Sequence, residues 1–169
     1  MQLSARYDLG WMLGRTYDSQ ICSVAGSLEV VGERWSLLIV RDAFMGARRF
    51  EEYQRRTGMA RNILAARLNR LVDEGILSRT PYQEHPVRYE YRLTEKGIDL
   101  WPVIVSLLQW GDRHIYPGRA PILLVHKRCG GAVSDHRICE TCGVELGPRD
   151  VEVRQGVGGG MVPSSAGAA

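Results

Sequence analysis

The strongest constraint on the fold is a change in the spacing of apolar residues between positions 35 and 93. Residues 35–44 form an apolar run that predicts a helix, and the run stops at Gly46, which can take the left-handed backbone that favours a helix end. Residues 49–53 place two aromatic side chains three positions apart, on one helix face. After a break at Gly58, helical spacing returns in the apolar residues Leu64, Leu68, Leu71 and Val72.

Beyond Gly75 the period changes from helical to alternating. Residues 87–93 place Val87, Tyr89, Tyr91 and Leu93 on one face, residues 76–82 form the run before them, and residues 83–86 join the two. This pattern predicts a two-stranded antiparallel wing that follows the helices. The order of elements therefore predicts a mostly α fold with a small β-wing, the winged helix-turn-helix, which is a DNA-reading module.

The predicted helix that starts near Ala60 has a polar face that the core does not use. In this architecture that helix enters the major groove, and its first residues, Arg61 and Asn62, are expected to contact bases, followed by Ala66 and Asn69. Arginines on this helix and before the preceding one are expected to hold phosphates, and wing residues to reach the minor groove or backbone. The full expected DNA-binding set is Ala60, Arg61, Asn62, Ala66, Asn69, Arg67, Arg70, Arg48, Arg49, Arg79, His85 and Arg88.

The distribution of charge supports this interpretation better than the total does. The formal net charge is only +3, but residues 48–70 contain seven arginines against Glu51 and Glu52. A local excess of this kind suits phosphate binding, since neutralised phosphates release counterions. The alternative is a solvated charged face in a chain whose arginine excess records a GC-rich genome. Without the helical pattern that alternative would be preferred.

Short runs in a fixed order carry a more specific signal. They are Cys22-Ser-Val-Ala, Gly32-Glu-Arg-Trp35-Ser-Leu-Leu-Ile, Arg48-Arg-Phe50, Asn62-Ile-Leu-Ala-Ala-Arg-Leu68, Leu71-Val-Asp-Glu-Gly75-Ile-Leu, Val87-Arg-Tyr-Glu-Tyr91 and Leu93-Thr-Glu-Lys-Gly97. Together they resemble the HxlR-type, MarR-like transcriptional regulators over about residues 22–114. The resemblance implies a homodimeric bacterial repressor or activator on a pseudo-palindromic operator. Residues 1–21 are longer than the usual lead-in, and we expect a helix or arm there.

The helix predicted after Thr94 carries more apolar surface than one small domain can cover. Pro102 is expected to kink it. We expect the excess surface to form a dimer seam, because two-fold operators need two-fold proteins. The alternative is packing within one chain. The expected seam residues are Trp101, Ile104, Val105 and Leu108, with Leu9, Trp11, Met12 and Leu13 supplying the other side.

Three of the four cysteines crowd into the C-terminal third, where His126 and Cys129 are followed by Cys139 and Cys142. In each pair the two residues stand three positions apart, and a glycine follows the second, as in a zinc knuckle. Three thiolates and an imidazole make a closed, structural Zn²⁺ site with no position for catalysis. His136 competes with His126 as fourth ligand, and the alternative to a metal site is three reduced thiols in a loose segment. A disulfide between Cys139 and Cys142 is disfavoured in a reducing cytoplasm.

Cys22 stands apart near the start of a predicted helix, where the dipole stabilises a thiolate. The resemblance raises a redox hypothesis for it, since several HxlR-type regulators sense electrophiles or oxidants through a cysteine in this position. The competing hypothesis is a buried apolar thiol. No second cysteine exists in residues 22–116 to resolve an oxidised Cys22.

These patterns divide the chain into four parts. We expect an N-terminal arm or helix over residues 1–21, a DNA-binding and dimerisation domain over 22–116, a zinc-ribbon-like extension over 117–154 and a disordered tail over 155–169. No apolar run spans a bilayer and no signal pattern stands at the N-terminus, so we expect a cytoplasmic protein without a membrane partner.

The predicted function is a sequence-specific DNA-binding transcriptional regulator, expected to be a repressor, that responds to an oxidant or a small-molecule effector. The alternative hypothesis is a protein-interaction adaptor, because winged helices also serve as binding surfaces. An enzyme is excluded on motifs: the sequence has no nucleophile elbow, metalloprotease motif or phosphate loop, and His85 and His114 have no carboxylate at motif spacing.

Overall fold

The computed structural model describes residues 21–159, which belong to two units that divide after Glu33. The first unit contributes helix α1 (Ser23–Val31), for which Cys22 is the N-cap. The predicted arm over residues 1–20, and with it the expected seam residues Leu9, Trp11, Met12 and Leu13, lies outside the described residues.

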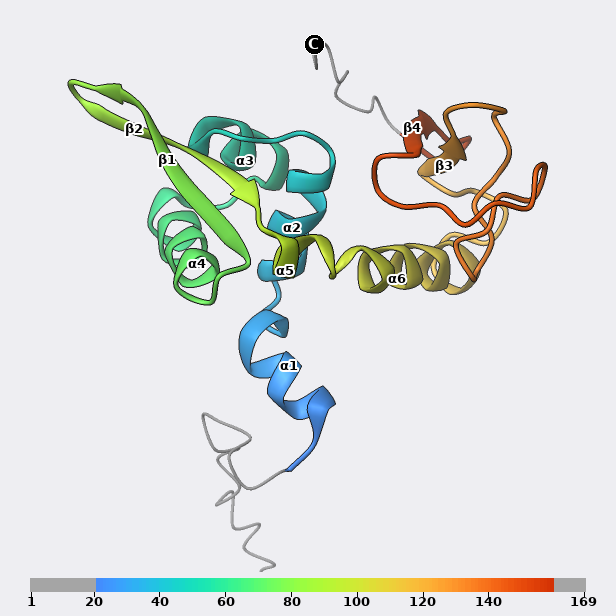
Figure 1. Cartoon of the computed structure of the whole chain (residues 1–169), viewed down its shortest axis with the longest axis horizontal. Coiled ribbons are helices and arrows are strands. Elements are labelled where there is room, and N and C mark those ends of the chain that lie inside the picture. The colour runs from blue at the N-terminus through green and yellow to red at the C-terminus, as the bar shows by residue number, and fades with distance from the viewer. Residues whose placement is uncertain (1–20, 160–169) are drawn as a thin grey trace, which may run out of the picture. The chain divides into compact units, whose positions relative to one another are not determined.

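The second unit begins with a winged helix-turn-helix, as the sequence predicts (Figure 1). Gly46 and Gly58 have φ values of 88° and 69°, so both helix ends use the left-handed backbone for which glycine carries no steric penalty. The elements are α2 (Ser36–Phe44), α3 (Phe50–Thr57), α4 (Arg61–Asp73), β1 (Leu77–Glu84) and β2 (Val87–Leu93).

A compact apolar core holds the three helices against the base of the wing. The apolar faces predicted for the helices are buried, and Tyr53 reaches across to donate its hydroxyl to the carbonyl of Ala47 at 2.9 Å. This bond satisfies the only polar group of a ring that is otherwise fully enclosed. The fully buried large side chains of this core are Ile39, Val40, Tyr53, Leu64, Leu68, Leu71 and Leu77.

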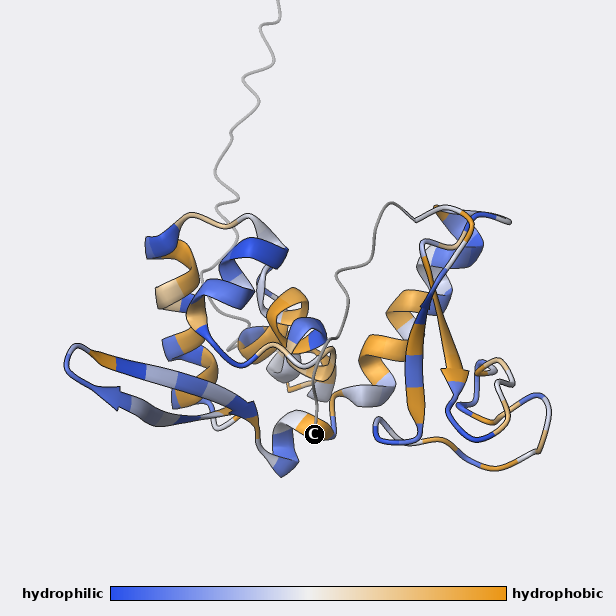
Figure 2. Ribbon diagram, turned by 90° about the horizontal axis from the view of Figure 1, so that it is seen from above, coloured by the Kyte–Doolittle hydropathy of each residue, from blue (hydrophilic) through white to orange (hydrophobic). Residues whose placement is uncertain are grey.

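The wing is an antiparallel pair that runs from Leu77 opposite Leu93 to Glu84 opposite Val87, with a register shift between Pro81 and Gln83. It extends beyond the helices in Figure 1 and is largely hydrophilic in Figure 2, whereas its base enters the core. The backbone N–H of Tyr91 donates to the carbonyl of Arg48 at 2.7 Å. This bond ties strand β2 to the segment before α3, so the wing is held beside the helix-turn-helix.

The helix predicted after Thr94 is two helices, α5 (Glu95–Ile98) and α6 (Trp101–His114). The predicted kink at Pro102 is therefore wrong. Pro102 lies in the first turn of α6, where its missing N–H would have had no helical partner. The first helix ends at Ile98, before the proline, and a second helix begins at Trp101.

The C-terminal segment folds onto α6 through strands β3 (Ile122–His126) and β4 (Val151–Gln155), which pair antiparallel. The side-chain amide of Gln109 donates to the carbonyls of Val133 and Ser134 at 3.0 and 2.8 Å. One apolar cluster joins the two parts and contains Trp101, Val105, Cys139, Leu146 and Val151. The segment and the helix therefore share a core.

This shared core changes the choice of dimer residues. Trp101, Ile104 and Val105, expected in a seam, are only 7%, 9% and 1% exposed within the single chain. The expectation was wrong for these three, because all three are buried within the single chain. The C-terminal segment and the helical core cover Trp101 and Val105, and Leu108 is half-buried. The apolar side chains that α6 leaves exposed are Val103, Leu107 and Trp110.

The boundary expected for the disordered tail falls too early. Gln155 belongs to β4, and the backbone N–H groups of Gly156 and Gly158 donate to the carbonyls of Pro121 and Ala120. Glycine-rich sequence suggested disorder, but here the missing side chains let the backbone lie directly against residues 120–121. Residues 160–169 lie outside the described part of the chain.

Thr94 caps α5, as the sequence predicts, and also ties that helix to the base of the wing. Its hydroxyl accepts from the N–H of Gly97 at 3.1 Å and donates to the carbonyl of Gly75 at 2.6 Å. We expect Thr94→Ala to lower the free energy of unfolding by about 1–2 kcal/mol, measured by urea denaturation. Thr94→Ser keeps the hydroxyl and should lie close to the parent protein. Equal stability of the alanine variant would contradict a capping role.

Candidate nucleic-acid interface and metal centre

The polar face of α4 is open to solvent along its length. Ala60, the N-cap, and Arg61, Asn62, Ala66 and Asn69 are all exposed, while the opposite side of the helix is fully buried. The two faces separate because apolar residues recur every three or four positions. The structure thus brings together on one surface the residues that the sequence assigned to base contacts.

Neighbouring aromatic and amide groups orient the first arginine of α4. The Arg61 guanidinium lies 4.9 Å from the centre of the Phe50 ring and donates to the Gln54 side chain at 3.3 Å. Both contacts are weak and solvent-exposed, so the cation is positioned but remains available. Arg70 forms an ion pair with Glu74 at 2.8 Å, and Arg67 is half-buried on the same helix.

The two arginines before α3 have different surroundings. Arg48 is half-buried, and its guanidinium donates to the carbonyls of Ala43 and Ala47, so its charge faces the end of α2. Arg49 is exposed, stacks 4.4 Å from the Tyr82 ring and pairs with Glu90 at 3.5 Å. The backbone N–H groups of both arginines donate to Glu52, which therefore occupies amides that were expected to face a phosphate.

The wing continues the α4 surface. Arg79 on β1 donates to Asn69 of α4 at 3.3 Å and lies 4.5 Å from the Tyr89 ring, while His85 and Arg88 are exposed toward the tip. The sequence analysis missed the aromatic supports Tyr82 and Tyr89, which orient the arginines of this surface. The signal was present, because the wing strands contain Tyr82, Tyr89 and Tyr91 together with Arg79, Arg88 and Arg92.

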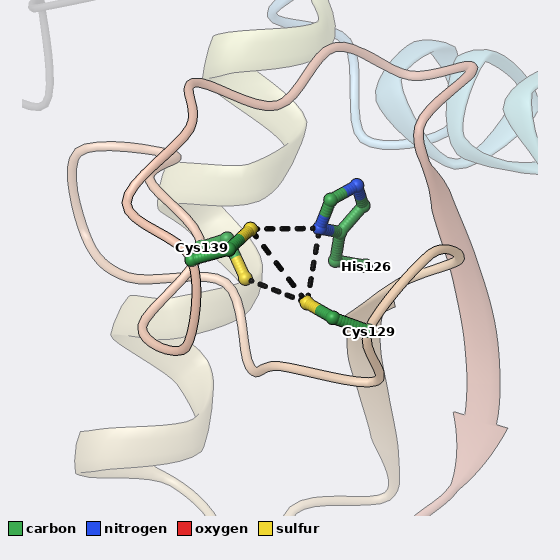
Figure 3. Close-up of side chains that lie close together, drawn as sticks. His126, Cys129 and Cys139 are labelled. Carbon is green, nitrogen blue, oxygen red and sulfur yellow. Dashed lines mark hydrogen bonds between the residues drawn. The ribbon is translucent and has the colours of Figure 1, made fainter.

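His126, Cys129, Cys139 and Cys142 form a tight cluster in the C-terminal segment, and their ligand atoms all lie within 4.8 Å of one another (Figure 3). Cys129 Sγ lies 3.2 Å from His126 Nδ1, 3.3 Å from Cys139 Sγ and 3.7 Å from Cys142 Sγ. Thiolates bound tetrahedrally at about 2.3 Å from a zinc ion are about 3.8 Å apart. The donor set and its spacing therefore suit a tetrahedral metal ion.

Two matching turns build the cluster. Gly130 N–H donates to the carbonyl of His126 at 2.7 Å, and Gly143 N–H to that of Cys139 at 2.8 Å. Both glycines have φ of 72°, a conformation that a side chain would disfavour. The predicted knuckle geometry is thus present in each half, and each turn brings its two donor side chains to one point.

The histidine comes from the end of β3, and it is nearly enclosed. His126 is 4% exposed, whereas His136, the competing candidate, is exposed and lies outside the cluster. Burial raises the pKa of the Cys139 thiol, but the N–H groups of Cys142 and Thr141 outweigh it, with help from the other two thiols, and lower that pKa to about 6. A thiol that ionises this readily is a good metal ligand.

Cys22, in the first unit, is exposed at the start of α1. The backbone N–H groups of Ala25 and Val24 point toward its sulfur and lower the pKa of the thiol. Because Cys22 is exposed in this unit, the hypothesis of a buried apolar thiol is wrong for it. It leaves a solvent-accessible thiol with enhanced ionisation.

Comparison with known proteins places this surface in context. Residues 30–119 match the family described as HxlR-like helix-turn-helix. Rv3095 of Mycobacterium tuberculosis, an uncharacterized HTH-type transcriptional regulator, is 47% identical over 137 residues, which cover 80% of this chain and 87% of that protein. The described part of this chain contains no helix long and apolar enough to cross a membrane.

Solved structures agree with that match. The crystal structure of PA1607, a candidate transcription factor, is 40% identical with a TM-score of 0.65, and the alignment covers 81% of this chain and 96% of that one. The redox regulator HypR in its oxidized form is 31% identical with a TM-score of 0.51, covering 55% of this chain and 97% of its own.

Proposed function

The chain belongs to the HxlR-like helix-turn-helix family of transcription regulators, which are not enzymes, and from this premise we propose that it acts in the cytoplasm as a homodimeric repressor on a pseudo-palindromic operator. One observation carries the proposal: the exposed face of α4 and the base of the wing form a continuous basic surface, joined by the contact between Arg79 and Asn69. On this surface Arg61 and Asn62 would contact bases in the major groove.

The remaining arginines are assigned by their surroundings. Exposed Arg49, Arg70 and Arg88 would contact phosphates, and His85 would lie near the backbone at the wing tip. We assign Arg48 a positioning role, because its guanidinium already binds two carbonyls at the end of α2.

The homodimer would form through the apolar side chains that α6 leaves exposed. Val103, Leu107 and Trp110 are 41%, 50% and 53% exposed, which is unusual for three neighbouring apolar residues of one helix. Contact with the same surface of a second copy would cover them and set two α4 helices a fixed distance apart.

The cluster of His126 and three cysteines would hold one structural Zn²⁺. Four protein ligands leave no open position, so the ion would supply folding energy to the C-terminal segment and no chemistry. This assignment is supported by the two glycine turns and by the low pKa of Cys139.

Selection from random duplex DNA tests the operator proposal. We expect the purified full-length protein to enrich sites with two inverted half-sites whose centres are about 10 base pairs apart, or a multiple of that spacing. Absence of enrichment over scrambled competitor DNA would overturn sequence-specific binding. Enrichment of single, asymmetric half-sites would overturn the homodimer.

Cys22 gives the regulator an oxidant input. At neutral pH we expect iodoacetamide to alkylate Cys22 faster than a free-thiol peptide, because the lowered pKa increases the thiolate fraction. Mass spectrometry of the zinc-loaded protein measures the rate, and Cys22→Ser identifies the modified site. A rate no faster than that of the peptide would refute the sensor assignment. HypR, described as a redox regulator, makes this input worth testing.

A further inference from the structure

An open groove of about 740 Å³ is lined by α2, α6 and part of the C-terminal segment, and it includes neither the metal cluster nor the exposed face of α4. Its walls are largely apolar, with Leu37 and Leu38 from α2 and Ile104 and Leu108 from α6. The charged side chains in the lining are Arg41, Asp42, Arg56 and Asp112. The volume falls in the range of about 300–1,000 Å³ that small-molecule sites occupy. Of the residues assigned above to DNA, metal or dimer contacts, Leu107 of the proposed dimer surface is the one that lines this groove.

A buried carboxylate lines the groove. Asp42 is 1% exposed, and its Oδ1 pairs with Arg41 at 2.9 and 3.0 Å. Its other oxygen, Oδ2, is buried and has no hydrogen-bond partner among residues 21–159. Buried polar atoms are nearly always paired, so an unpaired carboxylate oxygen in a groove wall indicates a missing donor.

A second unpaired group lines the same groove. Arg56 of α3 donates through Nη1 to the carbonyl of Met45 at 3.3 Å, but its Nε is buried without a partner in the described residues. Burial raises the pKa of Asp42, and the charges of Arg41 and Arg56 oppose that rise. Asp42 and Arg56 line the same groove, so both unpaired atoms belong to groove-lining side chains.

We propose that this groove binds a small apolar molecule that carries a hydroxyl group, an alcohol or a phenol. The hydroxyl is the simplest group that both donates and accepts, so it would donate to Asp42 Oδ2 and accept from Arg56 Nε. A hydrocarbon would leave both atoms unpaired, and a carboxylate would be repelled by Asp42. The apolar walls would enclose the rest of the molecule.

The groove and the exposed apolar side chains of α6 overlap at Leu107, which is 50% exposed and also lines the groove. Val103 and Trp110 are exposed but do not line the groove, whereas Ile104, Leu108 and Gly111 do. A ligand between α2, α3 and α6 would act on the helices that support α4. That effector role rests on the proposed function, whereas binding itself does not.

A matched pair of probes tests the site without DNA. We expect 4-ethylphenol to bind the full-length, zinc-loaded protein saturably in an NMR titration, and 4-ethylanisole, which cannot donate, to bind at least about tenfold more weakly. Asp42→Asn should weaken binding of the phenol at least about tenfold and leave the anisole unchanged. Equal affinity for the two probes, or no saturable shift, would overturn the proposal.

A filling variant tests the place of binding independently of Asp42. A Cβ at Gly111 would meet no atom within 4 Å, and Gly111 lines the groove, so Gly111→Leu should occupy the space and abolish phenol binding. Ser106→Leu, at an exposed position of α6 outside the groove, should bind like the parent protein. Light scattering supplies a further outcome: if Gly111→Leu converts a dimer to a monomer, the groove is a subunit interface and the proposal fails.

Discussion

Replacing both Arg61 and Asn62 with alanine is expected to lower affinity for the selected operator by about a hundredfold or more. Each specific base contact contributes about 1–3 kcal/mol of discrimination, so two lost contacts approach the level of non-specific binding. Both side chains are exposed, and Arg61 makes only a surface stacking contact and one hydrogen bond, so the fold should be unaffected. Fluorescence anisotropy with labelled operator at fixed salt measures the change.

Arg119→Ala is the charge-matched control, because Arg119 is exposed in the connection between α6 and β3, away from α4. It should bind the operator like the parent protein. If the double variant retained affinity within about twofold while a protein partner was still captured, the adaptor hypothesis would replace DNA reading.

Removal of the histidine ligand should have the largest effect on stability. Structural zinc contributes about 10–16 kcal/mol of binding free energy in small zinc-finger peptides, and here the ion would join the two halves of the C-terminal segment. We expect His126→Ala to retain less than about half an equivalent of zinc and to lose the β3–β4 pairing. Elemental analysis and hydrogen exchange over residues 122–155 measure both.

His136→Ala is the matched control for that experiment. His136 is exposed and lies outside the cluster, so this variant should keep one zinc per chain and full protection of β3. The opposite result, with zinc lost from His136→Ala and kept by His126→Ala, would reassign the fourth ligand. Parent protein purified without zinc, yet fully protected over the same residues, would refute a structural metal.

The helix-turn-helix and the wing were predictable because each depends on local pattern. Leu64, Leu68 and Leu71 recur at helical spacing, and residues 87–93 alternate, so the buried face of each element follows from its own residues. The metal cluster was predictable for the same reason: each pair of donors and its glycine lie within one short turn.

Which of several apolar residues on one helix is buried depends on parts of the chain that are distant in sequence. The sequence shows that α6 is apolar, but only the C-terminal segment determines that Trp101 and Val105 are covered while Val103 and Trp110 are not. The role of Arg48 could not be predicted either, because its guanidinium donates to the carbonyls of Ala43 and Ala47, and no sequence pattern indicates these contacts. Local composition also predicted too early a start for the disordered tail, since Gly156 and Gly158 donate hydrogen bonds to residues 120–121.

Trp101 and Val105 of α6 pack against Cys139 of the C-terminal segment, so α6 cannot be moved alone into another family member without exposing apolar side chains. HypR aligns over nearly its whole length with only 55% of this chain, so a relative of that size has little sequence left for a covering layer of this kind. A chimera that carried this α6 in so short a scaffold would present an indole and a valine to water. A graft of either part would therefore need α6 and the C-terminal segment to be moved together.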